Sequence, residues 1–570
     1  MNKNKGIRFT CRMTFILFFS FPMCIFSHAV AGKEFLPGLP AAEGTNVEGS
    51  VTCDGKGVGG VEVSDGYEVT LTNDRGMYRL NSNKKNGYVF ISIPSGYEVA
   101  CDGSRPVFFQ YLTRPVNDVE EKNFSLDRVD NRHYYLLCFS DTHLAARNND
   151  TQVFDHVFVP DINTTIGHLE SGGVKVYAIA LGDLTWDLYW YKDHFSLKDY
   201  LRQVNKIHCP VFNVMGNHDN DPYAAANPDD GTDADWNAAK PFKRIIGPSY
   251  YSFNLGNTHY VVLDDIQYLN TGGAQGKIGK RNYRNRIVQA QMEWLKKDLA
   301  TVSDKDAPLV IAMHIPLYDV PKLVGQQQKD RYCLETDNAE ALKQELAGFS
   351  NVQILSGHIH QSYNVTCDAH LFEHNTPAVC ATWWWTSKDG YARNMICKDG
   401  TPAGYGIYDF DGDKLSWQYK ALGYDTNYQF RTYDLNQCQI TAEKYAPSAD
   451  TTSVKKYAGV YAEKRNDNEV LINVWNFDPA WKVTVEENGR NLPVRRVRTK
   501  DPLHLISYEM LRLNHGKVPT KDFVTSFNSH SFLVKASSPA STLFIRVTDR
   551  FGNVYTQEMK RPKPLSCSMY

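Results

Sequence analysis

Five short apolar runs in the middle of the chain each lead into a residue that can bind a metal ion. The runs and the polar residues after them are Tyr134 to Phe139 before Asp141 and His143, Val174 to Leu181 before Asp183, Val211 to Met215 before Asn217 and His218, Leu309 to Met313 before His314, and Val352 to Leu355 before His358 and His360. Such runs are typical of buried strands in an α/β fold. Because α/β sheets place their sites at the carboxyl ends of strands, we expect these eight residues to lie together.

The segments between these runs carry helical patterns. Met292, Leu295 and Leu299 are spaced by three and four residues, and Leu342 and Leu346 repeat that spacing before a glycine. A further apolar run, residues 260–263, predicts another strand. Strands that alternate with amphipathic helices predict an α/β catalytic domain over residues 132–422.

The regions on either side of the catalytic domain look different. Short β-rich runs divided by glycine turns predict a small antiparallel β-sandwich over residues 46–127. Similar runs at 470–475, 481–485, 531–535 and 543–547 predict a second β-sandwich over residues 426–570. The predicted fold class is therefore α/β in the centre, with an all-β sandwich domain at each end.

The first 31 residues have the pattern of an export signal. Lys3, Lys5 and Arg8 precede an apolar run over residues 13–26, and small residues follow at 29–31. The alternative is a membrane anchor, but the run is shorter than the roughly 20 residues that a membrane span needs. We expect residues 1–31 to be removed and the protein to be periplasmic or extracellular, without a stable membrane span.

Charge and cysteine spacing exclude some classes of partner and site. The net charge is −2 and the pI is about 6.8, so the chain has no overall basic field to attract nucleic acid. No two of the ten cysteines beyond the predicted signal form a Cys-x-x-Cys pair. A zinc site made of cysteines is therefore not expected.

The types of residue at the strand ends suit a site for two metal ions. Two divalent ions about 3.5–4 Å apart can bind the attacking and leaving oxygens of a displacement at phosphorus. A carboxylate must bridge the ions, while imidazoles and an amide complete their ligand sets without excess negative charge. Gly182 and Gly216 precede two of the candidate ligands, and we expect them to let the backbone approach the metals closely.

The order of these segments resembles the calcineurin-like metallophosphoesterase superfamily. The matching segments are Asp141-Thr142-His143, Gly182-Asp183, Gly216-Asn217-His218-Asp219, His314 and Gly357-His358-Ile359-His360. The resemblance covers roughly residues 132–422 and implies a central calcineurin-like β-sandwich with flanking helices. Residues 49–78 also resemble carboxypeptidase-regulatory-like β-sandwich modules.

The resemblance implies a role for each residue of the site. The first metal would be bound by Asp141, His143, Asp183 and His360, and the second by Asp183, Asn217, His314 and His358, with Asp183 as the catalytic bridge. In this family a hydroxide held by the metals attacks phosphorus, and His218 contacts the phosphoryl oxygen or protonates the leaving group. Asp187 or Asp219 would orient His218. Mixed nitrogen and oxygen ligands suit manganese, iron and zinc alike.

These features predict a metal-dependent phosphodiesterase or phosphatase. Its substrate would be a phosphorylated small molecule, glycan or lipid head group. The alternative is an inert protein of the same fold that binds a glycan or a protein partner. Trp383, Trp384 and Trp385 follow the last ligand segment. They could form a wall for the substrate or an aromatic core under a long loop.

Overall fold

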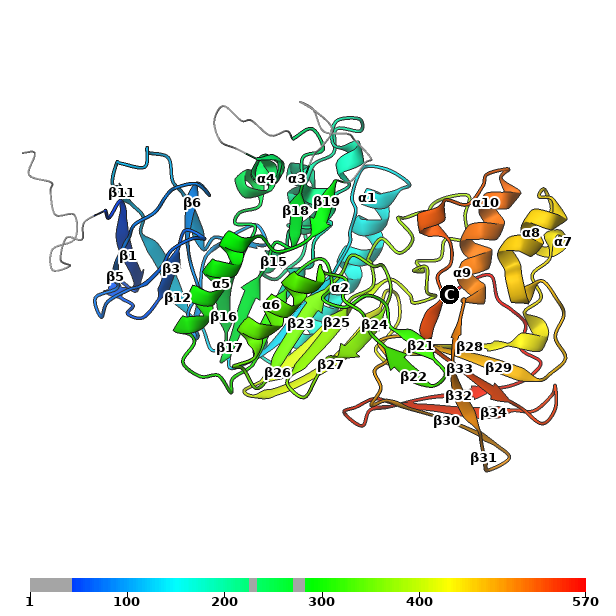
Figure 1. The fold of residues 1–570 in the computed structure, drawn as a ribbon. Coiled ribbons are helices and arrows are strands. Elements are labelled where there is room, and N and C mark those ends of the chain that lie inside the picture. The colour runs from blue at the N-terminus through cyan, green and yellow to red at the C-terminus, as the bar shows by residue number, and fades with distance from the viewer. Residues whose placement is uncertain (1–43, 225–232, 270–281, 570) are drawn as a thin grey trace, which may run out of the picture.

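The structure is a computed structural model that describes residues 44–224, 233–269 and 282–569. The predicted signal, residues 1–31, lies outside the described residues. Figure 1 shows three parts in a row, with the N-terminal sheets and the C-terminal part on opposite sides of the central domain. Among the described helices, none is both long enough and apolar enough to cross a membrane.

The N-terminal part consists of two sheets and a short strand pair. The first sheet contains β1 (Val47–Cys53), β2 (Lys56–Gly57), β5 (Met77–Leu80), β7 (Tyr97–Glu98), β11 (Glu120–Glu121) and β12 (Phe124–Arg128), the second contains β3 (Glu62–Ser64), β4 (Val69–Leu71), β6 (Tyr88–Ile91) and β10 (Phe109–Tyr111), and the pair is β8 (Cys101–Asp102) with β9 (Arg105–Pro106). The turn between β4 and β5 shows why the chain reverses there. The Asn73 side chain accepts the backbone N–H groups of Arg75 and Met77, and Gly76 adopts a φ of 74° that favours glycine.

Two sheets form the centre of the catalytic domain. The first has the strand order β15 (Val211–Asn213), β14 (Lys175–Ala180), β13 (His133–Phe139), β26 (Gly404–Asp411), β27 (Lys414–Ala421), and the second has the order β16 (Tyr251–Leu255), β17 (Thr258–Val262), β20 (Leu309–Ala312), β23 (Val352–Ser356), β25 (Leu371–Asn375), β24 (Tyr363–Thr366). Each of the six apolar runs forms one of these strands. Within each sheet the ligand-bearing strands are parallel, so their carboxyl ends lie at the same edge.

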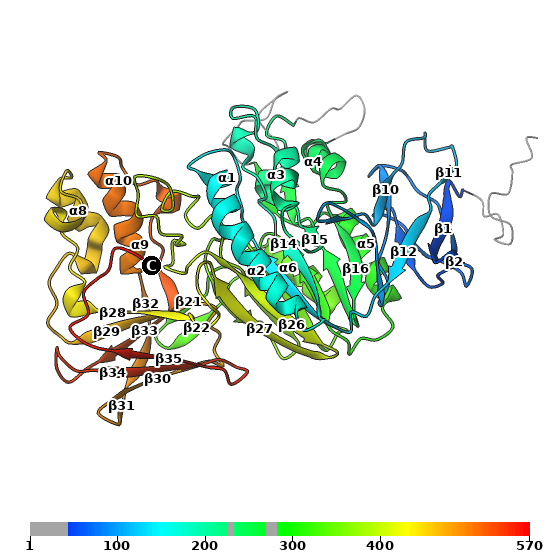
Figure 2. The same ribbon diagram turned by 180° about the vertical axis from the view of Figure 1, so that it is seen from behind.

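The alternating side chains of β13 show how the layers are joined. Leu136 and Cys138 belong to the core that the two sheets share, whereas Leu137 and Phe139 belong to a second core on the opposite face. This is the two-residue period of a strand with both faces buried. Figure 2 shows α2 (Val159–Glu170) lying across the sheet that contains β13 and β14. The predicted α/β fold class is confirmed.

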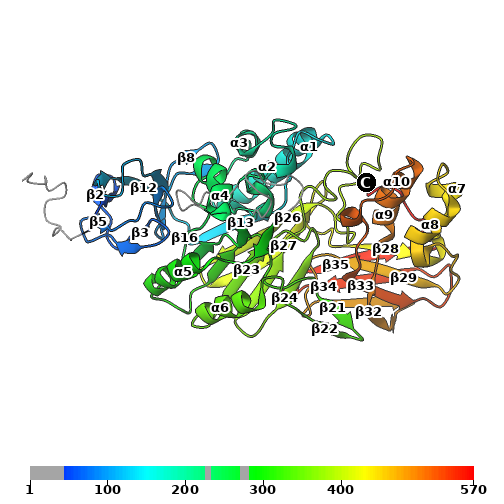
Figure 3. The same cartoon turned by 45° about the horizontal axis from the view of Figure 1, so that its top comes forward.

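Helices also cover the outer face of the second sheet. Helix α5 (Gln289–Thr301) buries Trp294 and Leu295, and α6 (Thr336–Leu346) buries Leu342 and Leu346 in the same core. Figure 3 shows these two helices on the side of the sheets opposite α2. The other helices of this domain include α1 (Asp150–Val153), α3 (Leu197–Val204) and α4 (Ala234–Ile245), and two strand pairs are β18 (Ile266–Tyr268) with β19 (Tyr283–Asn285) and β21 (Lys322–Val324) with β22 (Gln327–Lys329). Both predicted helices are present.

The C-terminal part combines two sheets with helices that the sequence pattern did not reveal. The sheets have the orders β28 (Phe430–Asp434), β29 (Glu469–Val474), β33 (Asn528–Lys535), β32 (Val494–Thr499) and β31 (Arg490–Leu492), β30 (Lys482–Glu487), β34 (Leu543–Thr548), β35 (Val554–Met559), and the helices are α7 (Ala442–Tyr445), α8 (Thr451–Ala458), α9 (Pro502–Leu505) and α10 (Leu511–Asn514). For α9, however, the sequence does contain residues typical of a helix start. Asp501 caps it by accepting the N–H of His504, and Pro502 stands in its first turn.

A buried carboxylate links the catalytic domain to the C-terminal part. Asp399 is fully buried, and its Oδ2 lies 3.2 Å from His530 Nε2. Its backbone carbonyl accepts hydrogen bonds from Asn473 and Asn528 of the C-terminal sheet. Next to it, Gly400 approaches the Asp501 side chain so closely that an added Cβ would lie 2.2 Å from Asp501 Cγ. The two parts are therefore joined by polar groups that no water reaches.

Candidate metal centre

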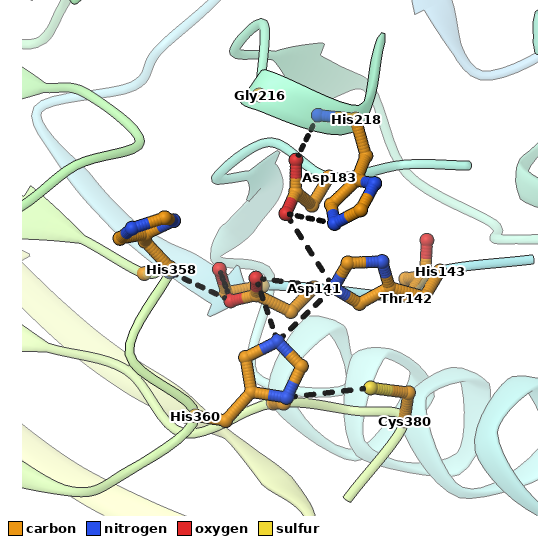
Figure 4. A network of polar contacts seen from close by, with 12 residues as sticks. Asp141, Thr142, His143, Asp183, Gly216, His218, His358, His360 and Cys380 are labelled. Carbon is orange, nitrogen blue, oxygen red and sulfur yellow. Dashed lines mark hydrogen bonds and ion pairs between the residues drawn. The ribbon is translucent and has the colours of Figure 1, made fainter. Parts of the chain in front are cut away.

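The structure brings all eight predicted site residues together. Asp141 and His143 follow β13, Asp183 follows β14, Asn217 and His218 follow β15, His314 follows β20, and His358 and His360 follow β23. Figure 4 shows the side chains of Asp141, His143, Asp183, His218 and His360, from four of these loops, facing one another. All are buried except His358, which is partly exposed. The site is thus formed by loops at the carboxyl edges of both central sheets.

Four of the residues surround one point. His143 Nε2 lies 3.0 Å from His360 Nε2, 3.6 Å from Asp141 Oδ1 and 3.5 Å from Asp183 Oδ2. His360 Nε2 lies 3.2 Å from Asp141 Oδ1, an oxygen that accepts no hydrogen bond from the described residues. Two imidazole nitrogens and two carboxylate oxygens at these separations fit the ligand set of a metal ion with mixed nitrogen and oxygen donors.

A second set of ligand atoms shares the Asp183 carboxylate. His314 Nε2 lies 3.3 Å from Asp183 Oδ2, 3.1 Å from Asn217 Oδ1 and 3.2 Å from His358 Nδ1. Asp183 Oδ2 therefore faces both sets, as a bridging ligand must. The two sets correspond to the two metal sites that the family resemblance implies.

The backbone is strained at five of the predicted ligands. Their φ values are 54° at Asp141, 41° at His143, 49° at Asp183, 68° at His358 and 56° at His360. Residues with a side chain rarely adopt this left-handed conformation. Strain of this kind gathers at functional sites, where the surrounding structure forces it on the chain.

Two glycines allow the ligand loops to approach one another. A Cβ on Gly216 would lie 2.0 Å from Asp183 N and 2.4 Å from Asp183 Oδ1. A Cβ on Gly182, whose φ is 84°, would lie 2.6 Å from His314 Nδ1. Both glycines therefore make room for ligand residues, by bringing backbone against Asp183 and His314.

Charges in the site keep the Asp183 carboxylate ionised. Burial acts to raise the pKa of Asp183, but the neighbouring His314, His218 and His143 hold this pKa well below its usual range. The pKa of Asp141 is likewise held low, against burial, by His360 and His143. Carboxylates must be ionised to bind a metal, so both side chains have the required form.

The structure selects one of the two acids considered for His218. The Nδ1 atom of His218 lies 2.5 Å from Asp187 Oδ1. Asp219 instead accepts backbone N–H groups of Gly216, Leu184 and Thr185. Burial and the nearby Asp183 raise the pKa of Asp219 to about 7. Asp187 is therefore the acid in contact with His218, while Asp219 fastens the loops together.

Sequence reasoning missed the thiol of Cys380. Its Sγ lies 3.7 Å from His360 Nδ1, and the same imidazole nitrogen lies 3.4 Å from the carbonyl of Ala381 (Figure 4). These contacts orient the ring whose other nitrogen faces Asp141. Cys380 lies twenty residues beyond its partner and belongs to no spacing motif, so only the fold reveals this role.

The three consecutive tryptophans have different environments. Trp384 is 2% exposed, belongs to the core and donates its indole N–H to the carbonyl of Thr142, between two predicted ligands. Trp383 is half-buried and stacks on His360 with ring centres 3.9 Å apart. Trp385 is also half-buried, and the cationic groups of Lys388 and Arg512 lie 3.9 Å and 4.8 Å from its ring centre. The core interpretation holds for Trp384, while Trp383 borders the site.

The C-terminal part reaches the loop that carries Trp383. His504 Nε2 lies 2.7 Å from Thr382 Oγ1, and His504 Nδ1 lies 2.7 Å from Thr525 Oγ1. Glu509 Oε2 is 2.9 Å from the same Thr525 hydroxyl. Burial lowers the pKa of His504 to about 3 and raises that of Glu509 to about 7. A protonated Glu509 completes this chain, because it can donate to Thr525 while Thr525 donates to the neutral imidazole.

We expect the Glu509→Gln substitution to change how stability depends on pH. Between pH 4.5 and about 7 the unfolded chain releases the proton that folded Glu509 keeps, so this carboxyl lowers the free energy of unfolding as pH rises. A glutamine retains the donor and the acceptor without titrating. The free energy of unfolding of the variant, relative to that of the unsubstituted protein, should therefore rise by about 1–3 kcal/mol from pH 5 to pH 8.

Chemical denaturation at several pH values measures this difference. Glu293→Gln, at an exposed position on α5, is the matched control and should show no such trend. A Glu509→Gln difference that stays constant with pH would show that Glu509 does not titrate in this range.

Comparison with known proteins finds matches to one family over three segments of the chain. Residues 45–129 match the N-terminal domain of calcineurin-like phosphoesterases, residues 134–362 match the calcineurin-like phosphoesterase domain, and residues 373–555 match the C-terminal domain of the same family. No curated protein matches the chain. Similar solved structures include a dimetal phosphatase from Danio rerio, at 12% identity and a TM-score of 0.34, covering 50% of this chain and 96% of that one. A 5′-nucleotidase from Candida albicans has 13% identity and a TM-score of 0.30, covering 50% of each chain.

The fold, the family matches and the clustered ligands define a metal-dependent phosphoric ester hydrolase. The chain belongs to the calcineurin-like phosphoesterase family, with the family's N-terminal, catalytic and C-terminal domains in order.

Proposed function

We propose that the protein is exported and hydrolyses a phosphodiester or phosphomonoester at a two-metal centre. The first metal would be bound by Asp141, His143, Asp183 and His360, and the second by Asp183, Asn217, His314 and His358. The observation that carries the proposal is the position of Asp183 Oδ2, 3.5 Å from His143 Nε2 and 3.3 Å from His314 Nε2, between the two sets of ligand atoms. Divalent manganese, iron or zinc suits these donors.

The catalytic residue outside the two ligand sets is His218. When bound, the metal ions stabilise negative charge on the phosphoryl group and supply a nucleophile near neutral pH. The contact with Asp187 holds the proton on His218 Nδ1, and His218 Nε2 points toward Asp183, at 3.9 Å from Oδ2. From there His218 would donate a proton to the leaving oxygen as the phosphorus–oxygen bond breaks. Asp187 would stabilise the charged imidazole.

The substrate class and location remain parts of the proposal. A phosphorylated small molecule, a glycan phosphate or a lipid head group would each present the required ester. Export to the periplasm or the cell exterior rests on the basic, apolar and small-residue order of residues 1–31. The alternative of an inert binding protein is disfavoured because none of the eight site residues is replaced or turned away.

An activity assay tests the proposal directly. Protein stripped with a chelator and then supplied with manganese, iron or zinc should hydrolyse p-nitrophenyl phosphate, bis-p-nitrophenyl phosphate or both. The stripped protein should be inactive until metal is added. Absence of hydrolysis with every metal, in protein that binds two ions, would favour the inert alternative.

A further inference from the structure

Three aromatic rings border one side of the metal centre. Trp383 stacks on His360, and Phe523 stacks on Trp383 with ring centres 4.4 Å apart. Trp186 lies 6.0 Å from the His218 ring and 6.5 Å from Phe523, between ring centres. All three aromatic side chains are half-buried. Phe523 comes from the C-terminal part, some 140 residues beyond Trp383.

The backbone that follows Phe523 is hydrogen-bonded to both parts of the protein. Two residues further on, Thr525 donates its backbone N–H to the buried Glu509 side chain. Ser526 then donates its backbone N–H to the carbonyl of Lys398 in the catalytic domain, at 2.8 Å. These hydrogen bonds fix the backbone next to Phe523 before any ligand binds, which lowers the entropy cost of binding.

Cations already flank these rings. The Arg147 guanidinium lies 6.0 Å from the centre of the Trp186 ring, and the Lys398 ammonium lies 5.8 Å from that of Trp383. Within the described residues the Lys398 side chain makes no ion pair or hydrogen bond. Sites for quaternary ammonium groups offer aromatic faces to the ligand's own charge. Arg147 also pairs with Asp193, at 3.7 Å, so Lys398 is the cation that repels such a ligand, and a neutral or anionic flat group is favoured.

The position of His218 identifies the part of the substrate that meets these rings. Under the proposed function, on which this inference rests, His218 protonates the leaving oxygen, and the Trp186 ring centre lies 6.0 Å from the rings of both His218 and the predicted ligand His143. We propose that Trp186, Trp383 and Phe523 form a leaving-group subsite selective for phosphoesters of flat aromatic groups. The C-terminal part therefore supplies a specificity residue to the catalytic domain.

The test compares two esters in variants of one loop. Phe523→Leu keeps apolar volume but removes the aromatic face. It should lower kcat/KM for 2-naphthyl phosphate about tenfold, and that for glycerol 2-phosphate less than threefold. Phe527→Leu removes an exposed ring that contacts Arg498 instead, and is the matched control with both rates unchanged. Methyl esters of the same two phosphates replace them if only diesters are hydrolysed.

The outcomes separate the two proposals. If the unsubstituted protein with metal hydrolyses neither ester, nor the nitrophenyl esters, the proposed function fails. If it hydrolyses them but Phe523→Leu changes both rates by the same factor, the leaving-group subsite is wrong. Trp186→Leu provides a second variant should Phe523→Leu fold poorly, and the same selective loss is expected. Preference for phosphocholine, whose leaving group is cationic and not aromatic, over glycerol 2-phosphate, lost in these variants, would instead indicate a cation subsite and overturn the inference.

Discussion

The Asp183→Asn variant is expected to have a kcat for metal-dependent hydrolysis that is lower by about a thousandfold or more. The substitution removes the negative charge that would join the two metal ions, and with it several kcal/mol of transition-state stabilisation. Asp183 Oδ2 faces both His143 and His314, and Oδ1 accepts the backbone N–H of His218. A neutral amide cannot bridge two cations in this way. Metal content, measured by mass spectrometry after gel filtration, should fall from two ions per chain to one or none.

A second buried carboxylate serves as the control for this variant. Asp298 is fully buried and lies 2.9 Å from His259 Nε2, in a pair between α5 and β17 that is separate from the metal ligands. Asp298→Asn removes a comparable buried charge and should keep both metals and the activity. If Asp183→Asn kept two metals and normal turnover, Asp183 would not be the bridge.

His218→Asn should separate catalysis from metal binding. Since His218 is not assigned to either ligand set, both metals are expected to remain. Loss of the proton donor should lower kcat by about 10²–10⁴-fold for esters with poor leaving groups. The loss should be smaller for p-nitrophenyl esters, because p-nitrophenolate leaves without a proton.

The neighbouring acid gives a graded comparison. Asp187→Asn retains an oxygen that can face His218 Nδ1 but removes the charge that stabilises the protonated ring. We expect a loss smaller than that of His218→Asn, with metal content again unchanged. Full kcat in His218→Asn, with all leaving groups, would remove this histidine from the mechanism.

The sequence predicts which residues the structure brings together, because each of them is placed by a local pattern. Each ligand follows a short apolar run, and parallel strands bring their ends to one edge. The strand β13 and the residues Asp141 and His143 after it illustrate this, since the position of the strand determines where its loop begins. The sequence could not choose between Asp187 and Asp219. That choice depends on how two loops fold against each other, and Asp219 turned inward to three backbone N–H groups.

The borders of the site were much harder to predict. Phe523 meets Trp383 only because two distant parts of the chain dock, and no sequence period relates them. The sequence also could not show whether the three tryptophans form a substrate wall or a core. The left-handed backbone at Trp383 and Trp384 sends neighbouring side chains in different directions, so both interpretations apply to part of the run. Helix α9 escaped notice because it is only four residues long, although Asp501 and Pro502 marked its start.

The buried contacts of Asp399 cross the predicted boundary between the catalytic domain and the C-terminal part, near residue 422. Separating the parts there would expose a carboxylate and several amides that now satisfy one another, and each buried polar group left without a partner costs about 1–3 kcal/mol. We therefore expect the catalytic and C-terminal segments to unfold together as one cooperative unit. A catalytic segment produced without the C-terminal segment would therefore lose both these contacts and the Phe523 ring that stacks on Trp383.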